Sequence, residues 1–296
     1  MPIRSAALIF STLSLLACES LRVIDIPSNN QNSRVNHLVI HFTSEDFTTS
    51  LEALTKPSSR PVSAHYLIPH TLDPTYSHAS VRVYRLVEEH NRAWHAGKSQ
   101  WFREQSLNDR SIGIELVNRS SCGPDQTESG QLYPLAEVCQ FKPYPEAQIQ
   151  ALIKLMSGIV SRHPEITPLN IVGHADIAPD RKVDPGPLFP WQRLYEAGFG
   201  AWYLEHDLQF YRDLVERKPL SIAAAQAALL RIGYPIELSG VEDATSQRVV
   251  RAFQMRYRPK AYSGILDSET IAIALALLNR YRPMLLSEIA VPTHTN

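Results

Sequence analysis

Short runs of apolar residues, each bounded by polar or loop-forming residues, recur along the first two thirds of the chain. Runs of this length are typical of β-strands in a sheet with at least one buried face. The predicted strands cover residues 37–42, 63–68, 81–87, 111–117 and 170–174. A longer stretch with helical spacing begins at Pro145 and ends near Pro164, and residues 191–198 form a second helical pattern. Residues 35–203 are therefore predicted to form one α/β or α+β domain, with a central sheet covered by helices.

The pattern becomes purely helical after Pro219. The predicted helices cover residues 221–234, 243–257 and 267–281. Thr245 is expected to cap the second of them and Asp267 the third, because short side-chain oxygens accept hydrogen bonds from the first helical turn. Residues 219–282 are therefore predicted to form a compact three-helix domain. The two remaining segments are predicted to be a linker, residues 204–218, and a tail, residues 283–296.

The N-terminus has the pattern of an export signal. Arg4 precedes an apolar stretch, Ala6 to Ala17, which is too short to span a bilayer as a mature helix. Residues 1–17 are therefore predicted to be a signal peptide. The sequence LLAC resembles a bacterial lipobox, so Cys18 is predicted to carry a lipid and to anchor the protein to a membrane. The alternative is an ordinary signal peptide that leaves Cys18 unmodified; in either case the polar residues 18–34 are expected to be a tether.

Composition narrows the range of functions. The 296 residues include 29 Lys and Arg against 30 Asp and Glu, so the chain lacks the basic field that nucleic-acid binding needs. A hydrophobic content of 44% supports a buried core and excludes global disorder. Besides Cys18, the chain contains Cys122 and Cys139. Export implies an oxidising compartment, where these two cysteines are expected to form a disulfide; two free thiols are the alternative.

Two histidines stand at places where a catalytic site is commonly built. His41 ends the predicted strand 37–42, and His174 ends the strand 170–174. Two imidazoles and one carboxylate are typical of a catalytic zinc site, in which the fourth position is left for water. The spacing does not select the carboxylate, which could come from Asp176, Asp180 or Asp184. A histidine at a strand end is also often only a satisfied polar residue.

Glu115 has the position expected of a general base. In the strand 111–117, Gly113 and Glu115 share one face and the apolar residues share the other. A carboxylate on such a face could project into a cleft and take a proton. The competing interpretation is a glutamate that faces solvent.

Five motifs together resemble the zinc-dependent N-acetylmuramoyl-L-alanine amidases of the type-2 family. They occur in one order over nearly all of residues 35–203, and together they are far more specific than any one of them. The motifs are VIHFT (39–43), SAHYLI (63–68), AWHAG (93–97), SIGIEL (111–116) and GHADIAPDRKVDPG (173–186). The resemblance implies an α/β fold with a mixed central sheet flanked by helices.

The resemblance also implies roles for individual residues. One zinc ion per chain is expected to be bound by His41, His174 and Asp184. Glu115 is expected to act as general base and then general acid, and Lys182 to stabilise the oxyanion. His65 and His95 are expected to contact substrate or to shape the pocket.

The C-terminal segment resembles a known wall-binding module. The sequences AAQAALLRIGYP (224–235), TSQRVVRAFQ (245–254) and GILDSETIAIALALL (264–278) are similar to the three-helix peptidoglycan-binding domain. The whole architecture resembles the lipoprotein amidases of the bacterial outer membrane. Cys18 is followed by Glu19 and not by the Asp that usually retains lipoproteins at the inner membrane. The resemblance therefore implies the outer membrane as the location.

The resemblance implies an enzyme that hydrolyses the amide between N-acetylmuramic acid and L-alanine. The expected partners are peptidoglycan or muropeptides and, through Cys18, a membrane; no nucleic acid is expected. Two alternatives remain: a wall-binding lipoprotein without activity, and a zinc peptidase that cuts within the stem peptide. The sequence leaves open the oligomeric state and the choice between ordinary and 1,6-anhydro muramic acid.

Overall fold

The computed structural model describes residues 22–125 and 131–289 of the chain. The described residues divide into two units, residues 22–32 and the part of the chain from Ser33 onward. In the first unit, residues 22–32 are exposed and contain no helix or strand. The predicted signal peptide and Cys18 lie outside the described residues. In the ranges that the structure describes, no helix is both long and apolar enough to cross a membrane.

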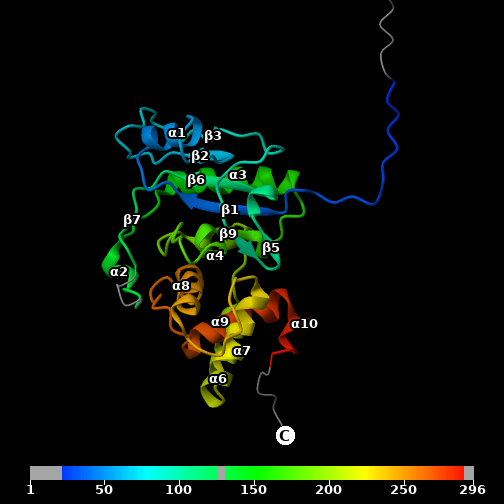
Figure 1. Cartoon of the computed structure of the whole chain (residues 1–296), viewed down its shortest axis with the longest axis vertical. Coiled ribbons are helices and arrows are strands. Elements are labelled where there is room, and N and C mark those ends of the chain that lie inside the picture. Colours follow the sequence, from blue (N-terminus) through cyan, green and yellow to red (C-terminus); the bar gives the residue numbers. More distant parts are fainter. Residues whose placement is uncertain (1–21, 126–130, 290–296) are drawn as a thin grey trace, which may run out of the picture. The chain divides into compact units, whose positions relative to one another are not determined.

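A five-stranded sheet forms the middle of the region that precedes the C-terminal helices, which lie below it in Figure 1. Its order is β3 (Tyr84–Arg85), β2 (Tyr66–Ile68), β6 (Ser111–Leu116), β1 (His37–Phe42) and β9 (Ile171–Gly173). Strands β2, β6, β1 and β9 are parallel, whereas β3 is antiparallel to β2. Residues on both faces of β1 and β6 are buried, as expected for parallel strands covered on both sides. The prediction of a mixed central sheet in an α/β fold is confirmed.

Helices and short two-stranded pairs surround this sheet. Helix α3 (Glu146–Arg162) packs against β2, and its Gln148 amide donates hydrogen bonds to the carbonyls of Ile68 and Val117. The other elements of the first 200 residues are α1 (Phe47–Thr55), β4 (Gln100–Trp101), β5 (Glu104–Gln105), η1 (Leu107–Asp109), β7 (Ser121–Cys122), α2 (Leu135–Val138), β8 (Cys139–Gln140), η2 (Pro168–Asn170), α4 (His174–Ile177) and α5 (Trp191–Glu196).

Three local features differ from the sequence predictions. Strand β3 is only two residues long, because Tyr84 and Arg85 pair only with Leu67 and Tyr66 of β2. Helix α1 was not predicted, although Asp46 caps it by accepting a hydrogen bond from the Thr49 amide at 2.8 Å. His174 does not end a strand; it is the first residue of α4, directly after β9.

The C-terminal region contains more helix than the predicted three-helix domain. The segment predicted as a linker is helix α6 (Glu205–Arg217), which packs against α9 through Leu208, Tyr211, Leu214 and Val215. These residues recur at helical spacing and form one buried face of α6. The sequence analysis missed this face because most other residues of the segment are charged or polar. The predicted tail begins with a short helix, α10 (Pro283–Leu286), and Ile289 beyond it is buried.

The three predicted C-terminal helices are present as α7 (Ile222–Ile232), α8 (Ala244–Tyr257) and α9 (Ser268–Tyr281). Asp267 caps α9 as predicted, through a hydrogen bond from the Thr270 amide at 2.9 Å. Asp243, and not Thr245, caps α8 by accepting from the Ser246 amide at 2.7 Å. Asp243 directly precedes the first helical residue, and from this N-cap position its side chain can reach the amides of the first turn.

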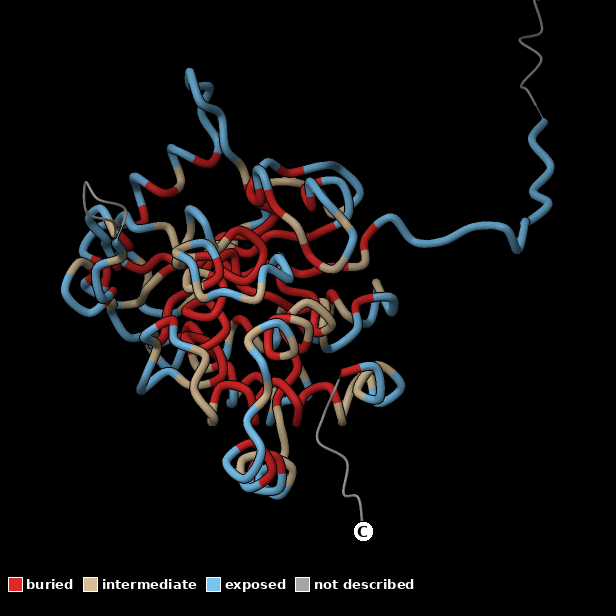
Figure 2. The backbone as a smooth tube through the Cα atoms, turned by 60° about the horizontal axis from the view of Figure 1, so that its bottom comes forward, coloured by how far each residue is buried: buried red, intermediate tan, exposed pale blue. Residues whose placement is uncertain are grey.

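One continuous hydrophobic core joins the sheet to the C-terminal helices. The same cluster of buried residues contains Ile40 of β1, Trp191 of α5 and Phe253 of α8. Figure 2 shows the buried stretches gathered inside the second unit. The C-terminal helices are therefore not a separately packed body on a free linker.

A disulfide joins Cys122 in β7 to Cys139 in β8, and these two residues are also paired in the strand register. They are 17 residues apart in sequence. Closing a loop of this size restricts the unfolded chain and contributes about 3 kcal/mol in the loop-entropy model.

Candidate metal site

Three buried side chains from distant parts of the chain converge on one point. His41 Nδ1 lies 3.0 Å from His174 Nδ1, and each of these nitrogens lies 3.1 Å from Asp184 Oδ2. Within the described ranges these residues form a group that could hold a metal ion. Of the three carboxylates that spacing left open, the structure brings Asp184 to the histidines. Asp180 is exposed, and Asp176 binds other partners.

The backbone around β9 and α4 positions two of these residues. Gly173 ends β9, and a Cβ atom at this residue would lie 2.6 Å from Pro185 Cδ, so only glycine fits there without a shift. His174 follows immediately as the first residue of α4. The Ala175 amide donates a hydrogen bond of 2.7 Å to the Asp184 carbonyl, which ties the loop carrying Asp184 to the first turn of α4.

A chain of hydrogen bonds fixes which nitrogen of His41 carries the proton. The Ser111 hydroxyl donates to the Leu107 carbonyl at 2.6 Å, so its oxygen accepts from His95 Nε2 at 3.2 Å. His95 Nδ1 is then unprotonated and accepts from His41 Nε2 at 2.9 Å. His41 Nδ1 is left with a free lone pair, which points to His174 and Asp184. In the same way, His174 Nε2 donates to the Ala96 carbonyl at 3.2 Å and leaves its Nδ1 free.

This geometry fits a metal ion. Two nitrogen lone pairs and a carboxylate oxygen point at one another, and three acceptors at about 3 Å repel unless a cation lies among them. Ligand atoms about 2.0–2.1 Å from a tetrahedral zinc ion are roughly 3.3 Å apart, close to the observed separations. The bonds from His41 to His95 and from His174 to Ala96 are of the kind that orients metal-binding imidazoles.

The electrostatics keep His41 and Asp184 in the states that metal binding needs. Burial, followed by the charge of His174, lowers the pKa of His41 to about 4, so its imidazole is neutral at pH 7. Burial acts to raise the pKa of Asp184, but the neighbouring imidazoles, His174 first and then His41, outweigh it and lower the pKa. Neutral imidazoles and an ionised carboxylate are the forms that ligate zinc.

A cavity of about 350 Å³ opens beside these three residues and is also lined by Glu115 and Lys182. Glu115 lies in β6 directly across from His41 in β1. Its Oε2 atom is buried and has no hydrogen-bond partner among the described residues. Burial, and then the charge of Asp184, raises the pKa of Glu115 to about 8, although Lys182 acts to lower it. An unpartnered carboxylate with a raised pKa is suited to accept and release a proton.

Because the pKa of Glu115 is raised in the folded protein, the free energy of unfolding of the metal-free protein is expected to depend on pH. Its pKa rises from 4.5 to about 8 on folding, so wild-type stability falls as pH increases through this interval. Glu115→Gln carries no such charge and is expected to be more stable than wild type by roughly 2–4 kcal/mol above pH 8. At pH 4.5 and below the two proteins should differ little. Urea unfolding at both pH values measures this; an equal difference at both would contradict it.

The two other predicted pocket histidines have different surroundings. His95 lines the cavity, and its ring occupies the space above Gly113, where a Cβ atom would lie 2.4 Å from His95 Cγ. His65 does not line the cavity. Its Nδ1 accepts from the Gly113 amide at 3.0 Å, and its Nε2 donates to the Asn91 carbonyl at 3.2 Å. Its ring lies edge-on to His95 at 5.8 Å, so His65 shapes the pocket from behind.

Several residues of the site were missed by the sequence analysis. Trp94 is 50% exposed at the cavity, beside His95, and provides an apolar surface at its rim. Ser111 ends the hydrogen-bond chain from His41, and Arg181 donates to the Ala96 carbonyl at 2.6 Å. Trp94 directly precedes His95, a predicted pocket histidine, so the sequence did contain a signal for Trp94. Ser111 meets His95 across 16 residues, and Arg181 meets Ala96 across 85 residues, so no local sequence pattern indicated either contact.

Two family models match the chain. Residues 31–187 match the model described as N-acetylmuramoyl-L-alanine amidase, and residues 220–273 match the model of a putative peptidoglycan binding domain. The first match contains the three converging residues and the cavity-lining Glu115 and Lys182.

Relatives and solved structures agree with these matches. The chain is 45% identical to the N-acetylmuramoyl-L-alanine amidase AmiD of Escherichia coli, over 81% of each protein. The structure of AMPDH3 from Pseudomonas aeruginosa in complex with anhydromuramic pentapeptide has 42% identity and a TM-score of 0.77, covering 91% of this chain and 99% of that one. AmiD of E. coli, in complex with anhydro-N-acetylmuramic acid-L-Ala-D-gamma-Glu-L-Lys, has 43% identity and a TM-score of 0.72, covering 86% and 93%.

Proposed function

The chain belongs to the N-acetylmuramoyl-L-alanine amidase family, and we propose that it hydrolyses the amide bond between N-acetylmuramic acid and L-alanine in peptidoglycan or muropeptides. The observation that carries this proposal is the convergence of His41, His174 and Asp184 beside a cavity that Glu115 and Lys182 also line. Two similar solved structures hold anhydromuramic peptides. This supports muropeptides with the 1,6-anhydro sugar as substrates of this chain.

The metal in this proposal is one zinc ion per chain. A site with three protein ligands, two of them histidines, and an adjoining cavity is typical of catalytic zinc, whereas structural zinc usually has four ligands with cysteine among them. His41 and His174 would bind it through Nδ1 and Asp184 through its carboxylate. Zinc in such a site supplies Lewis acidity and makes hydroxide available near neutral pH.

Glu115 and Lys182 have separate roles in the proposed hydrolysis. Glu115 accepts a proton from the attacking water and later delivers it to the nitrogen of the leaving L-alanine, so that the amide is replaced by a carboxylate and a free amine. The ammonium group of Lys182 stabilises the negative charge that develops on the carbonyl oxygen. Because Glu115 Oε2 has no hydrogen-bond partner among the described residues, the carboxylate is free to make both transfers.

A single incubation distinguishes this activity from the two alternatives. The zinc-loaded protein is mixed with an anhydromuropeptide, and with its ordinary muramic counterpart, and the products are identified by mass spectrometry. An amidase releases the intact stem peptide with a free L-alanine amine and leaves a lactyl carboxylate on the sugar. A peptidase would shorten the stem and leave the sugar substituted. Binding without any product would support the wall-binding protein without activity.

The C-terminal helices supply the proposed contact with the cell wall. The match to a peptidoglycan binding domain over residues 220–273 supports the assignment of 219–282 to this role, beside the proposed catalytic region 35–203. A second binding region raises the local concentration of substrate at the catalytic cavity.

For localisation we propose export and lipid attachment at Cys18, with the outer membrane as destination. The signal-like sequence of residues 1–17 and the exposed residues 22–32 support this. Cys18→Ala is expected to shift the protein from the membrane fraction to the soluble periplasmic fraction, because the acyl chain provides the attachment. Fractionation with labelled palmitate measures this. A variant that still sediments with membranes would exclude Cys18 as the anchor.

A further inference from the structure

A buried carboxylate next to the metal site is held by the C-terminal helical region. Asp176 lies in α4, two residues after His174, and its side chain and that of Arg256 are 3% and 2% exposed. Asp176 Oδ2 accepts from Arg256 Nη1 in α8 at 2.8 Å, and Oδ1 accepts from the Tyr234 hydroxyl at 2.6 Å. Both donors lie within the segment that matches the peptidoglycan binding domain.

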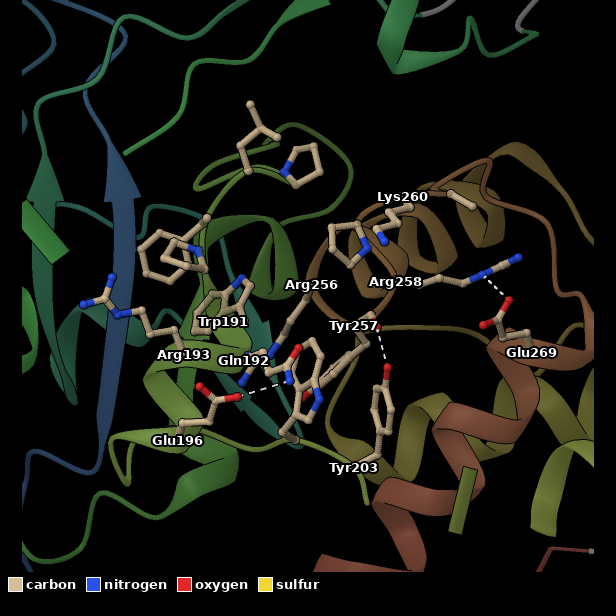
Figure 3. Close-up of a pocket in the computed structure, with 17 residues that line it drawn as sticks. Trp191, Gln192, Arg193, Glu196, Tyr203, Arg256, Tyr257, Arg258, Lys260 and Glu269 are labelled. Atoms are coloured by element: carbon tan, nitrogen blue, oxygen red, sulfur yellow. Dashed lines mark hydrogen bonds and ion pairs between the residues drawn. The ribbon is translucent and has the colours of Figure 1, made fainter. Parts of the chain in front are cut away.

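Arg256 also contacts two other elements of the sheet region. Its Nη2 donates to the carbonyl of Ile171 in β9 at 3.0 Å. Its guanidinium lies 4.1 Å from the centre of the Trp191 ring, and Figure 3 shows Arg256 extending toward Trp191 from the side of Tyr257. One side chain of α8 therefore binds β9, α4 and α5 together.

The position of Tyr234 is fixed independently. Its ring packs edge-on against Trp101 of β4 at 5.0 Å, and the Phe102 amide donates to the Gly233 carbonyl at 2.8 Å. Gly233 has a φ of 131°, and a Cβ atom there would lie 2.6 Å from Trp101 Cε2. The turn after α7 is thus fitted closely to β4, and this holds the Tyr234 hydroxyl at Asp176.

Asp176 connects these contacts to two of the proposed ligands. Its Oδ2 also accepts from the Gly173 amide at 2.8 Å, which closes the first turn of α4. That turn contains His174, and through the Ala175 amide it binds the backbone of Asp184. A rotation of this turn would move both His174 and Asp184 relative to His41.

We propose that Arg256 and Tyr234 are positioning residues for the metal site: by holding Asp176, they fix the first turn of α4, and with it His174 and Asp184. The inference rests on the metal site proposed above. A buried ion pair contributes little net stability compared with apolar packing, but it demands a specific geometry. The C-terminal helices thus complete the catalytic region as well as serving the proposed wall contact.

The test uses the full chain and three variants. Tyr234→Phe removes one hydrogen bond to Asp176 and keeps the ring. Arg256→Lys keeps the charge but removes the planar guanidinium, whose two terminal nitrogens bind Asp176 and Ile171 separately. Tyr281→Phe is the matched control, because its hydroxyl also joins a C-terminal helix to the earlier chain, accepting from the Trp202 amide and donating to the Trp202 carbonyl, both at 3.2 Å, away from α4.

Three quantities are measured: the zinc dissociation constant by chelator competition, the visible spectrum of the cobalt-loaded protein, and amide exchange at Gly173 without metal. Arg256→Lys is expected to weaken zinc binding about tenfold or more, Tyr234→Phe severalfold, and both to alter the cobalt spectrum. Gly173 exchange should quicken in both. Tyr281→Phe should match wild type in all three, even where its urea midpoint falls.

Unchanged zinc affinity and cobalt spectrum in Tyr234→Phe and Arg256→Lys would overturn the inference, as would an equal loss in Tyr281→Phe. If Arg256→Lys does not fold, Tyr234→Phe alone decides, because it removes a single hydroxyl. Failure of the proposed metal site is recognised separately, since wild type itself would then bind no zinc.

Discussion

Replacing His174 by alanine is expected to abolish zinc binding and to lower the rate of amide hydrolysis by about a thousandfold or more. The imidazole supplies one of three protein ligands, and removing it leaves His41 and Asp184 unable to hold the ion in a closed geometry. Loss of several kcal/mol of metal-dependent stabilisation of the transition state corresponds to a rate loss of about this size.

The measurement pairs metal analysis of the purified variant with product analysis on an anhydromuropeptide. His70→Ala is the matched control, because His70 lies outside the cavity-lining set and should keep both zinc and activity. Full zinc content in His174→Ala would place the ion elsewhere on the chain. Full activity without zinc would contradict the proposed chemistry.

Glu115→Ala is expected to retain zinc with wild-type affinity and to lose activity by about 10²–10⁴-fold. The carboxylate lines the cavity without a hydrogen-bond partner among the described residues, so its proposed work is proton transfer and not metal binding. Glu115→Gln should show the same loss, because an amide keeps the shape of the side chain but cannot take the proton.

Glu45→Gln provides the comparison for this variant. Glu45 lines the same cavity but is exposed, and neutralising it should leave the rate close to wild type. If Glu115→Ala loses its zinc, the glutamate belongs to the ligand set. If it keeps both zinc and activity, another group moves the proton.

The sequence predicted best where a local pattern and a local structure coincide. The strand 37–42 was predicted with its observed bounds, because an apolar run buried on both faces is a strong signal. His41 was correctly placed at the end of this strand. The carboxylate partner was not selected by spacing, because Asp176, Asp180 and Asp184 all lie within ten residues of His174. The hydrogen bond from the Ala175 amide to the Asp184 carbonyl, which holds Asp184 beside His174, has no signal in the spacing.

Prediction was poorest where the partner of a residue is distant in sequence. Helix α6 was predicted to be a linker because most of its residues are charged or polar. Its apolar residues lie on one face, and that face is buried only by packing against α9. Asp176 was one of three candidate metal ligands in the sequence analysis, but in the structure it is bound by Arg256, 80 residues away. No pattern within α4 or α8 alone indicates that pair.

Anomalous diffraction at the zinc absorption edge, from crystals of the zinc-loaded protein, tests the proposed site most directly. One strong peak is expected, about 2.0–2.2 Å from His41 Nδ1, His174 Nδ1 and an Asp184 carboxylate oxygen, with Glu115 outside bonding distance. A peak bound by other side chains, or by Nε2 of either histidine, would contradict both the ligand set and the tautomers derived from the hydrogen-bond chain.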